Sequence, residues 1–439
     1  MDDMDKIRMG LAADVAVIGG GVVGAAVFRE LVLHGYKVIL LEKDANVVHG
    51  ASSGNSGIAC TGYDAPIGSI ERRCIRRAME LNPTVYRELG LPSAPVGSLV
   101  VAWTPDDLAV LPHIVAANHG IGDTHVRALC PHEVYAMEPH LATGALGAVF
   151  VPGEVVVEPW LIPIAYLHHG LRNGGTLCTR HKVVGGDFDE GIWTLQCETD
   201  AAPSSSSRAT TVRARVVVNC AGLYSDIVEQ IHTPAVPFHI RPRKGQYIVL
   251  DAPPGIVTRV VQPVPTDRTK GVFVFRSLYG HVVVGPTAED QDARDDFSTT
   301  PETLDMLRAA AAKVVPALAS CAVVGSYAGL RPATEHRDYQ IEMDEARQWV
   351  TVGGIRSTGV TASLGIADYV ASLIDASHLG HVHRDTARCP TPFSLPPDLE
   401  CQGTSDTMTV TLDGVVHKVS HPLSRWGLSK RSQTMTRAL

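Results

Sequence analysis

The stretch Asp14-Val-Ala-Val-Ile-Gly-Gly-Gly-Val-Val-Gly24 decides how the fold of this chain is interpreted. Its apolar start, residues 15–18, predicts a strand, and a helical pattern follows from residue 22 to about residue 33. The turn between them has the G-x-G-x-x-G spacing of a dinucleotide site, and its three glycines are Gly19, Gly21 and Gly24.

Each of these glycines has a physical role in a dinucleotide site. Gly19 allows the tight turn from strand to helix, Gly21 lets a diphosphate approach the backbone, and Gly24 lets the helix pack close to the strand. The N-terminus of the helix then presents free N–H groups and the positive end of its dipole to the phosphates. The alternative is a glycine-rich turn in an ordinary α/β unit, and we favour the dinucleotide site.

An acidic residue follows at the expected distance. A second predicted strand, residues 37–41, ends in Glu42, eighteen residues after Gly24. A carboxylate there accepts hydrogen bonds from a ribose diol and repels a 2′-phosphate. The motif by itself does not distinguish NAD from FAD.

Composition bounds the class of protein. The chain has 439 residues, 45% of them hydrophobic and 19% charged, which suits about two domains with a large core. The net charge of −8 argues against nucleic acid as a partner. We expect no membrane-spanning segment, because no apolar run is long enough. The acidic start of the chain resembles no secretory or mitochondrial leader, so we expect a cytoplasmic protein.

The nine cysteines include no C-x-x-C pair. Reduced thiols, and no zinc or iron–sulfur site, are therefore expected. The arginines of residues 72–77 are predicted to lie on a solvated helix face rather than in a binding patch, within a helix over residues 68–89 that Pro83 kinks or breaks.

Residues 50–64 are rich in small side chains and hydroxyls and directly follow the predicted ribose position. Such a stretch is often only a surface loop, but here we favour a loop that faces the cofactor. Two later strands, residues 216–219 and 349–352, also run into turns of small residues. A further strand, residues 321–328, is predicted to end in a turn at 329–332, and a helix is predicted from Glu158-Pro159 to residue 172.

Nucleotide-type elements therefore occur near the start, the middle and the end of the chain. This predicts an α/β fold in which a discontinuous Rossmann-like domain carries an inserted mixed β-sheet substrate domain, and the family resemblance given below identifies the Rossmann-like domain as FAD-binding. The predicted FAD-binding domain comprises residues 13–95, 150–235 and 326–387, and the substrate domain comprises 96–149 and 236–325. Residues 388–439 are predicted to be a tail or small subdomain that contains one hairpin, and a serine run at 203–207 is predicted to be a hairpin tip.

The chain resembles the flavoprotein superfamily of D-amino-acid oxidase and glycerol-3-phosphate dehydrogenase over roughly residues 13–380. Besides the opening motif with Glu42, the resemblance rests on Asn55-Ser-Gly57, Val218-Asn-Cys-Ala-Gly222, Lys244-Gly-Gln246, Gly285-Pro-Thr-Ala288, Gly329-Leu-Arg-Pro332 and Gly353-Gly-Ile-Arg-Ser-Thr-Gly359. It implies FAD rather than NAD, and it is strongest to the glycerol-3-phosphate oxidases and dehydrogenases, with 2-hydroxyglutarate dehydrogenases as neighbours.

The resemblance also implies which residues bind the cofactor. The opening glycines and the acid would bind the ADP half of FAD, the segment from Ser52 would follow the diphosphate and the flavin, and the segment from Gly354 would follow the ribityl chain. The full implied set is Gly19, Gly21, Gly24, Glu42, Lys43, Ser52, Ser53, Asn55, Ser56, Ala221, Gly222, Gly354, Ile355 and Gly359.

For the substrate, the resemblance implies that Arg331 binds an anionic group and that Lys270 and Ser357 lie in the active site. An arginine suits this role because its planar fork pairs twice with carboxylate or phosphate oxygens. Cys60 stands where the family has a histidine near the flavin, and a neutral thiol is a poor proton acceptor. His336 is an alternative base.

We therefore predict that the protein oxidises glycerol 3-phosphate to dihydroxyacetone phosphate by hydride transfer to FAD. The alternatives are FAD-dependent oxidation of a small 2-hydroxy acid, such as 2-hydroxyglutarate, or of an amino acid, and a non-catalytic flavin-binding subunit. The expected partner is a small anionic substrate, and the electron acceptor is left open among oxygen, a quinone and a protein.

Overall fold

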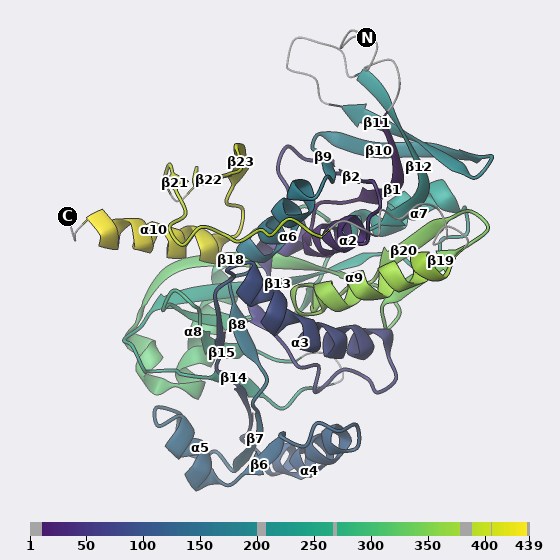
Figure 1. Cartoon of the computed structure of the whole chain (residues 1–439). Helices are drawn as coiled ribbons and strands as arrows, with labels where there is room; N and C mark the ends of the chain where they lie inside the picture. Colours follow the sequence, from purple (N-terminus) through teal and green to yellow (C-terminus); the bar gives the residue numbers. More distant parts are fainter. Residues whose placement is uncertain (1–10, 200–207, 267–269, 378–388, 405, 437–439) are drawn as a thin grey trace.

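Two large sheets form the body of the molecule (Figure 1). The computed structural model describes residues 11–199, 208–266, 270–377, 389–404 and 406–436, with the side chains of 208–209 and 430–436 left out. The predicted hairpin tip at 203–207 and the start of the chain, residues 1–10, lie outside these ranges. The predicted fold class, a Rossmann-like domain with a second sheet domain, is confirmed.

The first sheet has eight strands, and its central strands are parallel. Its path runs β10-β11-β12-β1-β2-β9, and the β19-β20 hairpin joins it where β20 pairs with β12. Its strands are β1 (Leu11–Ile18), β2 (Val38–Leu41), β9 (Thr176–Cys178), β10 (His181–Asp189), β11 (Ile192–Thr199), β12 (Arg208–Asn219), β19 (Gln340–Asp344) and β20 (Trp349–Gly353).

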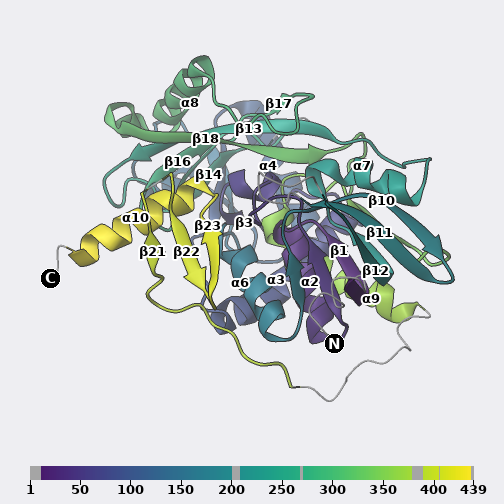
Figure 2. The ribbon, with the colours of Figure 1, turned by 90° about the horizontal axis from the view of Figure 1, so that it is seen from above.

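Alternation along β1 divides the core of this sheet into two layers. Val15 and Val17 point into a cluster with the helices, whereas Ala16 and Ile18 point to the other face, against Trp193. Figure 2 shows the helices of the first layer side by side. They are α2 (Val22–Leu33), α3 (Ile70–Glu88), α6 (Leu161–Arg172) and α9 (Gly359–Ala376), and α7 (Ser225–His232) packs on the other face.

The second sheet has nine strands and is mixed. Its path runs β17-β13-β16-β15-β14-β5-β7-β6, and β18 pairs with β13. Its strands are β5 (Ser98–Ala102), β6 (Arg127–Leu129), β7 (Gly147–Val151), β13 (Arg241–Asp251), β14 (Val260–Pro263), β15 (Phe273–Arg276), β16 (Val282–Gly285), β17 (Glu289–Asp290) and β18 (Ala322–Ala333). The helices α4 (Pro105–His119), α5 (Pro131–Met137) and α8 (Pro301–Val314) accompany it.

Two three-stranded sheets complete the fold. One joins β3 (Ile58–Ala59), β8 (Val155–Val157) and β4 (Ser93–Pro95), and its residues pack into the core clusters of both large sheets. The other is formed by β21 (Cys401–Gln402), β22 (Thr409–Leu412) and β23 (Val415–Lys418), and α10 (Pro422–Thr436) follows it.

The structure corrects three local predictions. The predicted turn at 329–332 is part of β18, whose register with β13 continues to Ala333. The helix expected from Glu158 begins at Leu161, and the Glu158 carboxylate accepts the N–H of Leu161 instead. Of the kink or break expected at Pro83, the break is wrong, because helix α3 continues through this residue.

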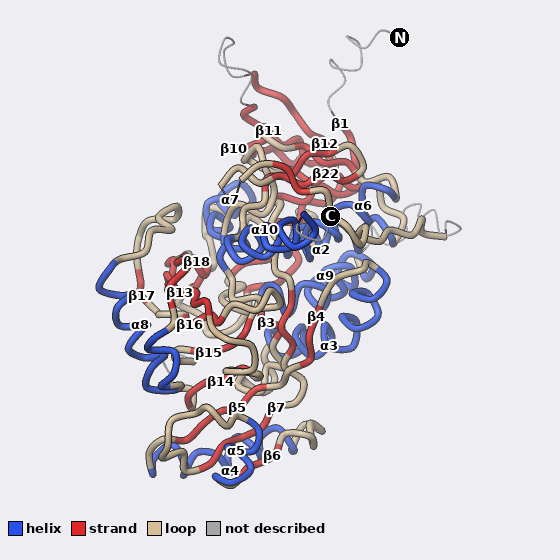
Figure 3. Tube along the Cα trace, turned by 90° about the vertical axis from the view of Figure 1, so that its left-hand side faces the viewer, coloured by secondary structure: helices blue, strands red, loops and turns tan. Residues whose placement is uncertain are grey.

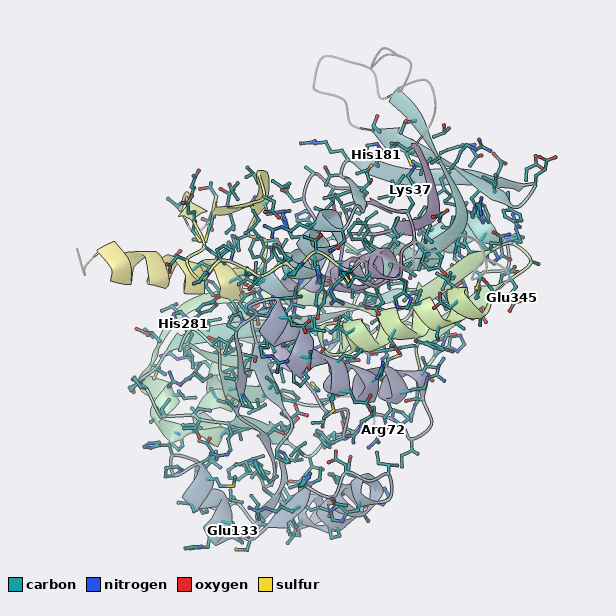
Figure 4. All side chains as sticks on the ribbon, in the orientation of Figure 1. Lys37, Arg72, Glu133, His181, His281 and Glu345 are labelled. Atoms are coloured by element: carbon teal, nitrogen blue, oxygen red, sulfur yellow. The ribbon has the colours of Figure 1, made fainter. Side chains whose placement is uncertain are left out.

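The sequence predicted that the arginines of α3 lie on a solvated face, and for one of them this is wrong. Arg72 is buried, and Figure 4 labels it on α3. Its guanidinium donates to the Ala65 oxygen at 2.6 Å and to Asn118 Oδ1 at 2.8 Å. Because Asn118 belongs to α4, this side chain joins α3 to the second sheet's helices. No helix in the described parts of the chain is long and apolar enough to cross a bilayer.

Candidate functional site

One cavity of about 1230 Å³ collects most of the predicted site residues. Its size exceeds that of a typical small-molecule pocket, as a dinucleotide together with a substrate requires. From the predicted set, the lining includes Gly19, Gly21, Glu42, Lys43, Ser52, Ser53, Asn55, Ser56, Cys60, Ala221, Gly222, Lys270, Arg331, Ile355, Ser357 and Gly359. Gly24 and Gly354 are not among the lining residues, and neither is His336.

At two positions in the turn after β1 and the first turns of α2, there is no space for any side chain, so only glycine fits. Gly19 has a φ of 108°, and a Cβ there would lie 2.5 Å from the Cys220 oxygen. A Cβ on Gly24 would lie 1.9 Å from the Gly19 oxygen. Gly24 does not line the cavity, and its role is to let α2 pack close to the turn. Gly21 lines the cavity, and only Ser52 Oγ lies near the position that its Cβ would take.

Glu42 lies at the end of β2 and is buried. Its Oε2 accepts the N–H of Gly20 at 2.7 Å, and its Oε1 accepts the N–H of Asp44 at 2.8 Å. Burial raises the pKa of this carboxyl group, and the two backbone donors oppose that shift. The carboxylate is thus fixed beside the glycine turn, where the ribose of a dinucleotide would lie.

The loop after β2 rests on the first turn of α2. Ser52 Oγ accepts the N–H of Val22 at 3.0 Å, so this hydroxyl lies at the N-terminus of α2. Asn55 closes the loop, because its Nδ2 donates to the Ser52 oxygen and its Oδ1 accepts the N–H of Gly57. Small residues and hydroxyls therefore line the cavity next to a helix N-terminus, an arrangement that fits a diphosphate.

This loop also touches the second sheet by its backbone. A Cβ on Gly54 would lie 2.4 Å from the Ala328 oxygen, and a Cβ on Gly329 would lie 2.1 Å from the Gly54 oxygen. The 3-10 turn Ala51–Gly54 and β18 are therefore in direct main-chain contact. The cofactor side and the substrate side of the cavity meet at these two glycines.

Arg331 lies on β18 at the wall formed by the second sheet. Its Nη1 and Nη2 donate to the Thr287 oxygen at 3.2 Å, and burial lowers its pKa. Gly245 on β13 leaves space for it, since a Cβ there would lie 2.6 Å from Arg331 Nη2. The acceptors are neutral carbonyl oxygens, so they do not balance the positive charge of this guanidinium.

Lys270 contributes a second cation, but it is paired. Its Nζ lies 2.8 Å from Asp64 Oδ1, and both side chains line the cavity. Cys60 lines the same region, and burial raises the pKa of its thiol, so the thiol is neutral at physiological pH. Ser357 also lines the cavity, from the turn between β20 and α9.

Sequence reasoning missed several lining residues. Asp64 ended a loop that was expected to face the cofactor, but its acidic side chain was not singled out. Tyr247 on β13 and Tyr327 on β18 line the cavity, and their rings stack with centroids 4.5 Å apart. The alternation of side chains between the two faces of these strands could have indicated that both residues point to the same face. The C-terminal part of the chain contributes further residues, for which no motif gave a signal: Lys418, Val419, Ser420, Pro422 and Arg425.

The sequence has relatives among proteins of known activity. It is 30% identical to a glycerol 3-phosphate dehydrogenase of Caloramator mitchellensis, over 82% of this chain and 73% of that protein. It is 27% identical to a glycerol 3-phosphate oxidase of Mycoplasma pneumoniae, over 82% of this chain and 94% of that protein.

The structure resembles the dithionite-reduced L-alpha-glycerophosphate oxidase from Mycoplasma pneumoniae with FAD bound. The TM-score is 0.77 at 26% sequence identity, and the match covers 88% of this chain and 99% of that one. Nearly the whole fold of the FAD-bound oxidase is therefore present in this protein.

The sequence model of the FAD dependent oxidoreductase family matches residues 14–373. This confirms the predicted cofactor, FAD, and the predicted enzyme class, an FAD-dependent oxidoreductase, and the two relatives above act on a CH–OH donor. The match runs from β1 to the last turns of α9, and this protein therefore belongs to the family of FAD-dependent oxidoreductases.

Proposed function

We propose that this protein oxidises glycerol 3-phosphate to dihydroxyacetone phosphate. The observation that carries the proposal is the presence of two cations, Arg331 and Lys270, at the wall of one cavity that also contains the glycine turn. A phosphate dianion needs more than one positive charge, and both side chains suit phosphate oxygens. The relatives that act on glycerol 3-phosphate support this choice of substrate.

We assign the cofactor roles to the predicted residues. Glu42 would hold the ribose diol, and the loop from Ser52 would hold the diphosphate at the N-terminus of α2. Bound FAD supplies the two-electron acceptor. The protein's part is then to bind and orient the substrate and to remove the proton of its hydroxyl group.

The proton acceptor in this proposal is Asp64. The thiol of Cys60 is neutral because burial raises its pKa, so it is a poor base. His336 faces the surface, where its Nε2 lies 3.0 Å from the Pro237 oxygen. Asp64 is a carboxylate at the cavity wall, and a phosphate that binds Lys270 would compete for its present partner.

A second candidate is oxidation of a small 2-hydroxy acid or an amino acid. One observation favours it: Asp64 already neutralises Lys270, which leaves Arg331 with neutral acceptors only in the contacts described above. A single uncompensated arginine is enough for a carboxylate. The two candidates therefore differ in whether Lys270 is needed.

The test is an anaerobic titration of the purified yellow protein, followed by its visible spectrum. Bleaching of the flavin by glycerol 3-phosphate, and not by 2-hydroxyglutarate or amino acids, is the expected result. Bleaching by a carboxylate substrate alone would favour the second candidate. A flavin that no substrate bleaches would contradict both and favour a non-catalytic flavin-binding subunit.

Substitution of the two cations sharpens this test. We expect Lys270→Met to weaken glycerol 3-phosphate binding by about tenfold or more, because a charge-assisted hydrogen bond is lost. Lys313→Met is the matched control, because Lys313 is an exposed residue of α8 that is not among the residues lining the cavity. If Arg331→Met abolishes substrate binding and Lys270→Met leaves it unchanged, the substrate is a carboxylate.

A further inference from the structure

The C-terminal segment of the chain is part of the cavity wall. Lys418, Ser420 and Arg425 line the same cavity as the glycine turn. This segment lies beyond residue 373, where the match to the family ends. Its contribution to the site is therefore not covered by any role that the family resemblance implies.

On the cofactor side, the segment holds the loop that carries the predicted diphosphate site. Ser420 Oγ donates to the Val48 oxygen at 2.5 Å, and the Val48 N–H in turn donates to the Gly20 oxygen at 2.9 Å. His421 Nε2 donates to the Asn55 oxygen at 3.0 Å. Two consecutive residues thus contact the two ends of residues 48–55.

His421 is suited to a fixed position. It is fully buried, and burial lowers its pKa to about 3, so the ring is neutral. Nε2 must carry the proton, because it faces a carbonyl oxygen, and Nδ1 accepts the N–H of Leu423 at 3.3 Å. Both ring nitrogens are therefore used, and the ring orientation is determined.

On the other side, α10 packs against the second sheet. The Trp426 ring covers Gly325 on β18, where a Cβ would lie 2.2 Å from the indole. Gly427 lies against the Tyr279 ring, with a Cβ position 1.9 Å from it. Figure 1 and Figure 3 show α10 next to β18 of the second sheet and below the small sheet β21–β23. The segment therefore contacts the loop at 48–55 on one side and the second sheet on the other.

Arg425 brings a positive charge that is weakly compensated. Its Nη1 lies 3.4 Å from Asp406 Oδ1, and the Asp406 side chain is 89% exposed. Exposed ion pairs of this kind contribute little. The guanidinium is thus available to an anion in the cavity. The backbone N–H of Arg425 donates to the His421 oxygen at 3.1 Å, in the first turn of α10, so Arg425 directly follows the residues that hold the loop.

We propose that residues 418–425 are part of the FAD site. Ser420 and His421 act as positioning residues for the loop at 48–55, and Arg425 adds positive charge for the FAD diphosphate. This inference rests on the FAD family and not on the proposed substrate. The diphosphate, rather than the substrate anion, is chosen because Ser420 is linked through Val48 to Gly20 in the glycine turn.

The test measures flavin binding to the apoprotein of the full chain. Arg425→Gln is titrated with FAD and with riboflavin, which has no phosphate, and Arg308→Gln on α8 is the matched control. We expect the dissociation constant of FAD to rise about tenfold for Arg425→Gln and to remain unchanged for the control. Binding of riboflavin should be the same in all three proteins.

Two outcomes would overturn the role of Arg425. One is unchanged FAD affinity in Arg425→Gln. The other is an equal loss for FAD and riboflavin, which would mean that the arginine acts on the fold rather than on the diphosphate. A protein that binds FAD as expected and does not oxidise glycerol 3-phosphate would contradict only the proposed substrate.

The positioning role is tested separately at His421. His421→Gln keeps a donor for the Asn55 oxygen, whereas His421→Leu removes it. We expect FAD affinity to fall for leucine and to return partly for glutamine, with the melting temperature of each apoprotein as the control for stability. Equal FAD affinity in both variants would show that this hydrogen bond does not position the loop.

Discussion

Cys60 illustrates how one side chain limits the chemistry at the flavin. Burial raises the pKa of its thiol, and the nearby carboxyl of Glu154 acts in the same direction. Because the thiolate is the reactive form, we expect Cys60 to resist iodoacetamide at pH 8 while the exposed Cys130 and Cys389 react. Mass spectrometry of the peptides measures this.

We also expect Cys60→Ser to keep kcat within about twofold, and a large loss of kcat would mean that the thiol takes part in the reaction.

Asp64 is the residue on which the proposed base chemistry depends. We expect Asp64→Asn to lower kcat by about a hundredfold or more, the usual effect of losing a general base. KM should not rise, because Lys270 loses a competing partner and gains freedom to bind phosphate. Steady-state kinetics measures both values. A rise in KM with kcat preserved would assign Asp64 to binding instead, and Asp368→Asn, outside the cavity lining, is the control.

Among the elements, α3 and α9 pack closely through a glycine. A Cβ on Gly365 would lie 1.9 Å from the Cys74 oxygen, which is a main-chain atom that cannot move aside. We expect Gly365→Ala to destabilise the protein by about 2–3 kcal/mol, although alanine by itself favours a helix. Urea unfolding measures the change. Gly120→Ala, with no neighbour of its Cβ closer than 3.4 Å, should be nearly neutral.

Elements with a clear period and a defined start were predicted well. Helix α2, for example, occupies the expected residues 22–33. The predicted turn at 329–332 was wrong because glycine and proline suggested a break. Gly329 serves instead to let the Gly54 backbone approach, and Pro332 is tolerated because β18 has one pairing partner, β13, among the described strands.

At the scale of the whole molecule, Glu154 couples folding to pH. It is buried, its Oε1 accepts the N–H of Thr61 at 2.9 Å, and burial raises its pKa to about 7. The folded state therefore keeps a proton that the unfolded chain loses above about pH 4.5, and stability falls as the pH rises from that value through 7.

This linkage gives a measurable difference. We expect the unfolding free energy to fall by about 3 kcal/mol between pH 4.5 and pH 8 from this group. Glu154→Gln imitates the protonated form, so it should flatten this dependence, whereas the exposed Glu302→Gln should not. Urea unfolding across this pH range is the measurement. A variant at Glu154 with the same pH dependence as the original protein would show that the carboxyl is ionised in the folded state.

The site as a whole could be predicted only in part. The glycine turn, Glu42 and the loop from Ser52 carry motifs, and the structure places them at one cavity. The wall formed by the C-terminal segment has no motif, because its contribution comes from long-range packing. Arg425 and Gly20, for example, are more than four hundred residues apart in the sequence.

The contact between Gly54 and Gly329 has a consequence for how specificity can change. Arg331 follows Gly329 by two residues on the same strand, so main-chain contact fixes the separation between the proposed anion-binding arginine and the flavin loop. Side-chain substitutions elsewhere on β13 or β18 then alter the shape and charge around a substrate without altering that separation. The contact therefore selects substrates by the distance between their anionic group and their oxidisable carbon. It sets no limit on the remaining groups of the substrate.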